Sequence, residues 1–165
     1  MAENILEDDI FIEDTQHGRY LIFHLGEEIF GLEIKYVIEI IGIQSITKIP
    51  ETKQYIKGII NLRGKIIPVI DMRLKFGKEE IDYTDRTCIV VIDIDSVFVG
   101  LIVDGVEEVL TIQDDEISTP PSSRTGFENN YIKGISKVNE KIQLLLECKK
   151  LLNTSELELI EDQIN

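Results

Sequence analysis

The sequence predicts a mainly β fold, made by tandem duplication of two small five-stranded barrels of the SH3-like or OB-like kind that pack against each other. Short runs rich in Ile and Val alternate with Gly, Asp, Asn and Pro, as in half-buried strands joined by turns. The pentapeptide YIKGI occurs at 55–59 and again at 131–135, an offset of 131 − 55 = 76 residues. A second pattern, Gly-Leu-x-(Ile/Val)-x-x-Val-x-Glu, begins at Gly31 and at Gly100, an offset of 100 − 31 = 69. Repetition of both patterns in the same order indicates two copies of one β unit.

Each copy is expected to contain two β-hairpins. RYLIFHL and EIFGLEI flank Gly26-Glu27, and Gly at the first position of a two-residue loop suits a type II′ turn. CIVVIDI and VFVGLIV flank residues 95–96 in the same way. YIKGIIN and KIIPVID flank residues 62–64, and YIKGISK and KIQLLLE flank residues 138–140. About five strands in each copy cannot hide both faces of an open sheet, whereas closure into a barrel removes the exposed edges.

The expected organisation has three parts. An acidic extension covers residues 1–18, and one domain covers residues 19–152, with a first subdomain over about 19–80 and a second over about 81–152. A short C-terminal helix covers residues 153–165, where Ser155 can cap a first turn rich in acids. The sequence leaves open whether strands at the ends of the domain cross from one barrel to the other. The longest loop is expected over residues 119–130, which are rich in Pro and Ser.

The charge balance disfavours polyanionic partners. The 165 residues include 31 acids and 17 bases, for a net charge of −14. Nucleic-acid binding depends largely on cationic side chains that meet phosphates, and anionic membrane surfaces attract the same residue types. The N-terminus is acidic, unlike the start of a secretory signal, and no apolar run approaches the roughly 20 residues of a membrane helix. We therefore expect a cytoplasmic protein without nucleic-acid partners or direct membrane insertion.

Residue types that carry chemistry are sparse. His17 and His24 are isolated from other candidate catalytic residues in the sequence, and Cys88 and Cys148 have no metal-ligand spacing and suit buried free thiols. The stretch from Gly58 to Gly64-Lys65 has one residue too many for a phosphate loop, and Ile follows the Lys where Ser or Thr is needed. We therefore predict no catalytic residues, no metal site, no cofactor and no enzymatic activity.

Differences and agreements between the copies mark candidate interaction residues. Arg63 stands at the tip of one hairpin, where the second copy has Asn139. An arginine on a tight apolar tip can anchor an interface, or it can lie exposed over its own barrel, and the sequence leaves both readings open. Val37 and Val106 agree between the copies, so they can line the seam between the barrels or belong to the core.

The runs YLIFHLGEEIFGLEIKYVIEI, ITKIP and YIKGIINLRGKIIPVIDMRLKFG, followed by VGLIVDGVEEVL and the second YIKGI, resemble the CheW family, the coupling proteins of bacterial chemotaxis. The resemblance covers residues 19–152. It implies a groove between the two barrels, adaptor binding without catalysis, a monomer when isolated, and recruitment from the cytoplasm to membrane-associated receptor arrays.

Two partners follow from the resemblance. The regulatory domain of the chemotaxis histidine kinase CheA would contact Glu39, Ile43, Thr47, Ile49, Lys57, Gly58 and Arg63. The cytoplasmic hairpin tip of methyl-accepting chemotaxis receptors would contact Leu21, Ile34, Val37, Arg63, Val103 and Val106. The alternatives are a CheW-like module of a CheV-type or other two-component system, or an OB-type oligonucleotide-binding module, which the charge and the 7% aromatic content oppose.

Overall fold

The computed structural model describes residues 17–120 and 131–152. The expected C-terminal helix over 153–165, nearly all of the N-terminal extension and most of the long loop lie outside these described residues. The strands are β1 (Arg19–Leu25), β2 (Glu28–Glu33), β3 (Val37–Gly42), β4 (Ile56–Leu62), β5 (Lys65–Asp71), β6 (Cys88–Ile94), β7 (Val97–Val103), β8 (Gly105–Thr111), β9 (Ile117–Ser118), β10 (Ile132–Val138) and β11 (Lys141–Leu146). The short helices are η1 (Ile34–Tyr36), α2 (Met72–Lys75), η2 (Asp114–Glu116) and α3 (Cys148–Leu151).

The strands form two sheets, which confirms the mainly β prediction. One sheet has six strands in the order β8-β1-β2-β11-β10-β9, and the other has five in the order β3-β6-β7-β5-β4. The sixth strand is β9, only two residues long. A short C-terminal helix is also present, as α3.

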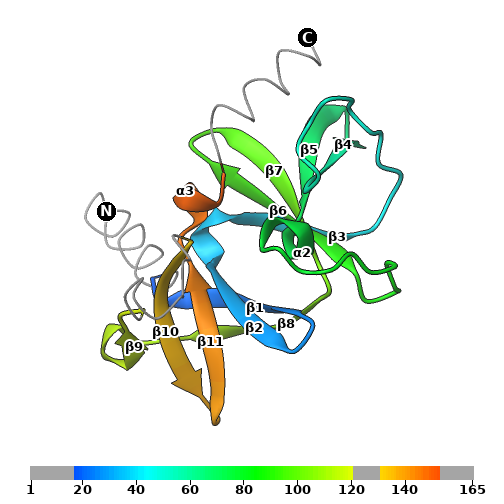
Figure 1. The fold of residues 1–165 in the computed structure, drawn as a ribbon. Helices are drawn as coiled ribbons and strands as arrows, with labels where there is room; N and C mark the ends of the chain where they lie inside the picture. The colour runs from blue at the N-terminus through cyan, green and yellow to red at the C-terminus, as the bar shows by residue number, and fades with distance from the viewer. Residues whose placement is uncertain (1–16, 121–130, 153–165) are drawn as a thin grey trace, which may run out of the picture.

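Each sheet combines strands from both copies of the repeat. The β1–β2 hairpin joins β8 and β11 of the second copy, and Figure 1 shows blue β2 beside orange β11. The β6–β7 hairpin likewise joins β3 and β5 of the first copy. The boundary near residue 80 therefore separates the two sequence repeats and does not separate the two sheets.

The two parallel ladders have the same register. Val69 on β5 lies opposite Gly100 on β7, and Leu145 on β11 lies opposite Gly31 on β2. These pairs correspond through the two repeat offsets, because 69 + 76 = 145 and 31 + 69 = 100. The copies thus share a pairing scheme as well as a sequence pattern.

All four hairpins close through two-residue turns. Gly26 has φ +61° and Glu27 has no positive φ, as in the expected type II′ turn. In the other three turns both central residues have positive φ, which is the type I′ form. These are Arg63-Gly64, Asp95-Ser96 and Asn139-Glu140.

The largest apolar cluster is shared by the two sheets. It takes Phe23 and Phe30 from the six-stranded sheet and Val90 and Leu101 from the five-stranded sheet, all at most 2% exposed. A smaller cluster, which includes Ile67, fills the five-stranded barrel, and another fills the six-stranded one. Burial at roughly 25 cal/mol per Å² makes this shared core the main force that holds the sheets together.

Candidate partner-binding surfaces

A charged clasp fixes the two sheets beside the shared core. The guanidinium of Arg73 on α2 donates to the carboxylate of Asp104 through Nε and Nη2, at 2.7 to 3.0 Å. The backbone N–H of Gly26, at the β1–β2 turn, donates to the same carboxylate at 2.6 Å. Arg73 and Asp104 are only 16% and 15% exposed. The clasp therefore joins the six-stranded sheet, through Gly26, to the five-stranded sheet, through α2.

The expected kinase-contact residues gather on the five-stranded sheet. Glu39 lies on β3, Lys57 and Gly58 lie on β4, and the others precede β4 or follow it at the hairpin tip. Thr47 joins this group because its backbone exchanges two hydrogen bonds with Ile59, at 2.9 and 2.8 Å. The connector between β3 and β4 is therefore held against β4.

Gly58 is required by this close approach. It has φ +144°, and a Cβ built at this position would lie 2.0 Å from the carbonyl oxygen of Thr47. No other residue fits without displacement of the connector. Ile43 and Ile49, at either side of Thr47 in the chain, are partly buried against the apolar clusters, so they anchor the connector at both ends.

Arg63 forms an ion pair with Glu39 through both terminal nitrogens. The pair joins the β4–β5 tip to β3, the two opposite ends of the five-stranded sheet order, and so helps to close the barrel. Arg63 remains 71% exposed and Glu39 is 24% exposed. The arginine thus lies over its own barrel and still presents most of its surface to solvent. Lys57 forms a second surface ion pair, with Glu80.

All five apolar residues expected in the receptor groove belong to the shared cluster. Leu21 and Val103 are only 2% and 1% exposed, so their side chains lie beneath the surface. Ile34, Val37 and Val106 are partly buried and pack against the shared cluster. These five residues therefore differ in exposure, and Ile34, Val37 and Val106 are the three that reach the surface in part.

The structure adds apolar neighbours that the sequence reasoning did not select. Ile38 and Ile40 on β3 are each 44% exposed, and they flank Glu39. Cys88, at the start of β6, packs partly buried against the shared cluster beside the backbone of Val106. Burial raises the pKa of its thiol, against the effect of that backbone contact. The apolar residues on both sides of Glu39 in β3 were the one available signal for the isoleucines.

Asp71 and Tyr83 form a polar contact that stabilises the start of α2. Asp71, the one buried carboxylate in 17–120 and 131–152, caps α2 by accepting from the N–H of Arg73 and of Leu74, and it accepts from the hydroxyl of Tyr83 at 3.0 Å. Burial and the nearby carboxylate of Asp71 raise the pKa of Tyr83. Within the same ranges, His, Cys, Asp and Glu form no group of three or more that could hold a metal ion. No helix of this part of the chain has the length and apolar character needed to cross a bilayer.

Comparison with known proteins agrees with this architecture. The family model described as CheW-like domain matches residues 19–156. Chemotaxis protein CheW of Klebsiella aerogenes is 35% identical over 149 residues, which cover 90% of each chain, and that of Rhizobium meliloti is 33% identical over 145 residues, 87% of this chain and 94% of the relative. The crystal structure of scaffolding protein TtCheW from Thermoanaerobacter tengcongensis has a TM-score of 0.74 and 41% identity, over 79% of this chain and 88% of that one. The chain described here belongs to the CheW-like family.

Proposed function

We propose that the chain is a chemotaxis adaptor that couples chemoreceptors to the histidine kinase CheA by protein–protein binding, without catalysis. The observation that carries this proposal is the match to chemotaxis proteins named CheW over nearly the full length of both chains. The adaptor would act in the cytoplasm, at membrane-associated receptor arrays. Weak individual contacts suffice there, because many copies bound together raise the effective affinity.

The kinase regulatory domain would dock on the five-stranded sheet. The surface around β3, the Thr47 connector and the β4–β5 tip combines exposed isoleucines with the Arg63–Glu39 ion pair. Apolar centres with arginine nearby are typical of interface hot spots. The connector is held by Gly58 and Thr47, so the surface is formed before a partner binds.

The receptor tip would dock where the two sheets meet. Ile34, Val37 and Val106 offer partly exposed apolar surface that belongs to the same cluster as buried Leu21 and Val103, which suits an amphipathic helix that packs through its apolar face. The Arg73–Asp104 clasp ties the two sheets to each other. The sheets would therefore keep their relative position when the partner helix dissociates.

Calorimetric titrations with the isolated CheA regulatory domain and with a receptor cytoplasmic fragment test both contacts. Arg63→Glu places a second carboxylate beside Glu39 and should weaken kinase binding about thirtyfold, the effect of losing an anchor worth about 2 kcal/mol. The matched control is Asn139→Glu, at the equivalent turn position of the second copy, where φ is +52° against +50° at Arg63. This control should bind the kinase domain like the unmodified chain.

For the receptor fragment, Val37→Asp should abolish measurable binding, because it puts a charge on a partly buried residue of the shared cluster. Val109→Asp, at an exposed valine on β8 that belongs to neither set, is the control. Circular dichroism and thermal unfolding would establish that each variant is folded. A folded, unmodified chain that binds neither partner would overturn the proposed function.

A further inference from the structure

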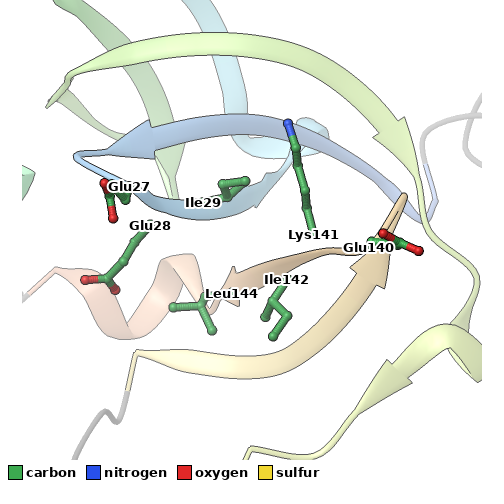
Figure 2. A pocket seen from close by; sticks show the side chains of 7 residues that line it. All are labelled: Glu27, Glu28, Ile29, Glu140, Lys141, Ile142 and Leu144. Carbon is green, nitrogen blue, oxygen red and sulfur yellow. The ribbon is translucent and has the colours of Figure 1, made fainter.

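A surface hollow lies where the tips of two hairpins diverge. Strands β2 and β11 begin to pair at Ile29 and Gln143, so the β1–β2 and β10–β11 tips beyond this point separate from each other. The hollow between them measures about 390 Å³. Figure 2 shows Ile29 on one side of it and Ile142 and Leu144 on the other.

The floor of the hollow is apolar and exposed. Ile142 is 59% exposed, more than any other large hydrophobic residue in the described ranges. Ile29 and Leu144 beside it are half-buried. Isolated exposed apolar residues are common on protein surfaces, but three that line one concave site indicate a place where another molecule binds.

At the equivalent place on the five-stranded sheet, a cation covers an aromatic ring. There the ammonium group of Lys65 lies over the ring of Phe98, 3.2 Å from its centroid. The repeat offsets relate Lys65 to Lys141, because 65 + 76 = 141, and Phe98 to Ile29, because 98 − 69 = 29. Since Ile29 has no aromatic ring, the second site lacks this cover.

The rim of the hollow is acidic. Figure 2 places Glu27 and Glu140 at its opposite ends, with Glu28 near the first. Lys141 also lines the hollow, and Glu28 forms an ion pair with Lys78. Three carboxylates and one lysine thus line the hollow, and Lys78 neutralises one of the carboxylates, so the rim keeps a small negative excess.

A smaller hollow adjoins it and adds to the negative charge. It shares Ile29 and Lys141 and is also lined by Glu107, Glu108 and Asn139. Glu108 corresponds to Glu39, because 39 + 69 = 108, and Asn139 corresponds to Arg63. In the five-stranded sheet the arginine neutralises its carboxylate, whereas asparagine carries no charge with which to neutralise Glu108.

We propose that this hollow binds a basic amphipathic helix of a partner protein, on a surface separate from both proposed chemotaxis contacts. The acidic rim selects lysine or arginine beside the apolar anchors. Ile142 and Leu144 lie on the same face of β11, about 7 Å apart along the strand, which is close to the ~6 Å rise between residues i and i+4 of a helix. A second copy of this chain fits poorly, because each copy has a net charge of −14.

The test uses the full chain and three labelled peptides of equal length. The first is a helix-forming peptide with leucines at i and i+4 among lysines, the second has alanines in place of the leucines, and the third has glutamates in place of the lysines. Fluorescence anisotropy gives the affinities, and amide chemical shifts give the location. We expect the first peptide alone to saturate, with shifts centred on Ile29, Ile142 and Leu144.

Two variants and a matched control separate this site from general attraction to an acidic protein. Ile142→Ser and Glu140→Lys should each weaken the first peptide about tenfold, which corresponds to about 1.4 kcal/mol. Ile66→Ser makes the same change at the equivalent position of the other sheet, where Ile66 is 46% exposed, and should leave affinity unchanged.

The proposal is overturned if the alanine or the glutamate peptide binds as well as the first, or if Ile66→Ser has the effect of Ile142→Ser. Self-association that Ile142→Ser abolishes would put a second copy in the hollow and would also overturn it. None of these results depends on binding to the kinase or to a receptor, so the proposed chemotaxis function is tested separately.

Discussion

The Arg73–Asp104 clasp should contribute far more to stability than the other Arg–carboxylate pair that the structure describes on the five-stranded sheet, Arg63–Glu39. Both pairs use two guanidinium nitrogens, so the types of group are matched. They differ in exposure, since Arg73 is 16% exposed and Arg63 is 71% exposed. Solvent screens an exposed pair and leaves it worth roughly 0–1 kcal/mol, whereas removal of one partner from a buried pair costs about 3–5 kcal/mol.

The clasp is closer to a buried pair than to an exposed one, because its two side chains are only 16% and 15% exposed. Arg73→Ala leaves the carboxylate of Asp104 with the N–H of Gly26 as its remaining donor, and Asp104→Ala leaves both the guanidinium and this N–H without their acceptor. We expect each change to lower the free energy of unfolding by about 2–4 kcal/mol. Arg63→Ala should lower it by no more than about 1 kcal/mol.

Urea unfolding followed by circular dichroism measures these differences, and the double variant Arg73→Ala/Asp104→Ala completes a cycle. A coupling energy of about 2 kcal/mol is expected, because the two side chains share three hydrogen bonds. Equal losses for Arg73→Ala and Arg63→Ala, or a coupling near zero, would refute the argument from exposure.

The clasp also predicts a pH dependence. Burial favours the neutral form of Asp104, but the bonds from Arg73 and Gly26 outweigh it and lower the pKa of this carboxyl group. The clasp's contribution to stability is therefore full above the unfolded pKa, about 3.9, and is lost as the pH falls through the lower folded pKa. Urea unfolding at pH 7, 4 and 3 should show that the difference in free energy of unfolding between the unmodified chain and Asp104→Asn becomes smaller on acidification. A difference that stays constant over this range would contradict the predicted sign.

Two further predictions concern the backbone at Gly58 and the two thiols. Gly58→Ala should lower the free energy of unfolding by about 3–5 kcal/mol, because of backbone strain and the clash with Thr47, and should weaken binding of the CheA regulatory domain. Gly64→Ala is the control, because φ is +85° there but no atom lies within 4 Å of a Cβ built at this position. It should lower the free energy of unfolding by only about 1–2 kcal/mol in the same urea assay. With a thiol reagent at pH 8, Cys88 should react in the folded chain, whereas Cys148 should react only after unfolding, because it is fully buried and burial raises its pKa to about 12. Rapid labelling of both thiols in native buffer would contradict the second prediction, and equal losses for the two glycine variants would contradict the first.

Local patterns predicted the elements better than their assembly. The positions of the hairpins follow from alternating apolar runs and turn residues, and Gly64 adopts the positive φ expected of a hairpin turn. The exchange of the β1–β2 and β6–β7 hairpins between sheets has no local signal, because the two copies share one pairing pattern and either arrangement satisfies it.

The same limit applies to the candidate surfaces. The resemblance selected residues that the structure brings together in the shared cluster, yet it could not indicate that Leu21 and Val103 lie beneath the surface while Val37 and Val106 reach it. Exposure depends on which strands pack above each side chain, and this is set by contacts between distant parts of the chain. The Thr47–Ile59 bridge is likewise a long-range contact, and Gly58 at its centre was the one residue that could have suggested it.

Duplication explains how one small chain can present different surfaces. Some positions at which the copies agree support the fold: Tyr55 and Tyr131 begin the two YIKGI segments, and their ring centroids lie 4.3 and 5.2 Å from the ammonium group of Lys75. Where they differ, the change alters surface charge or cover, as at Arg63 and Asn139. A symmetric pair of barrels would offer every partner two equal sites. Divergence at the tips removes this ambiguity at little cost to stability, because tip side chains are exposed and the shared core is unaffected.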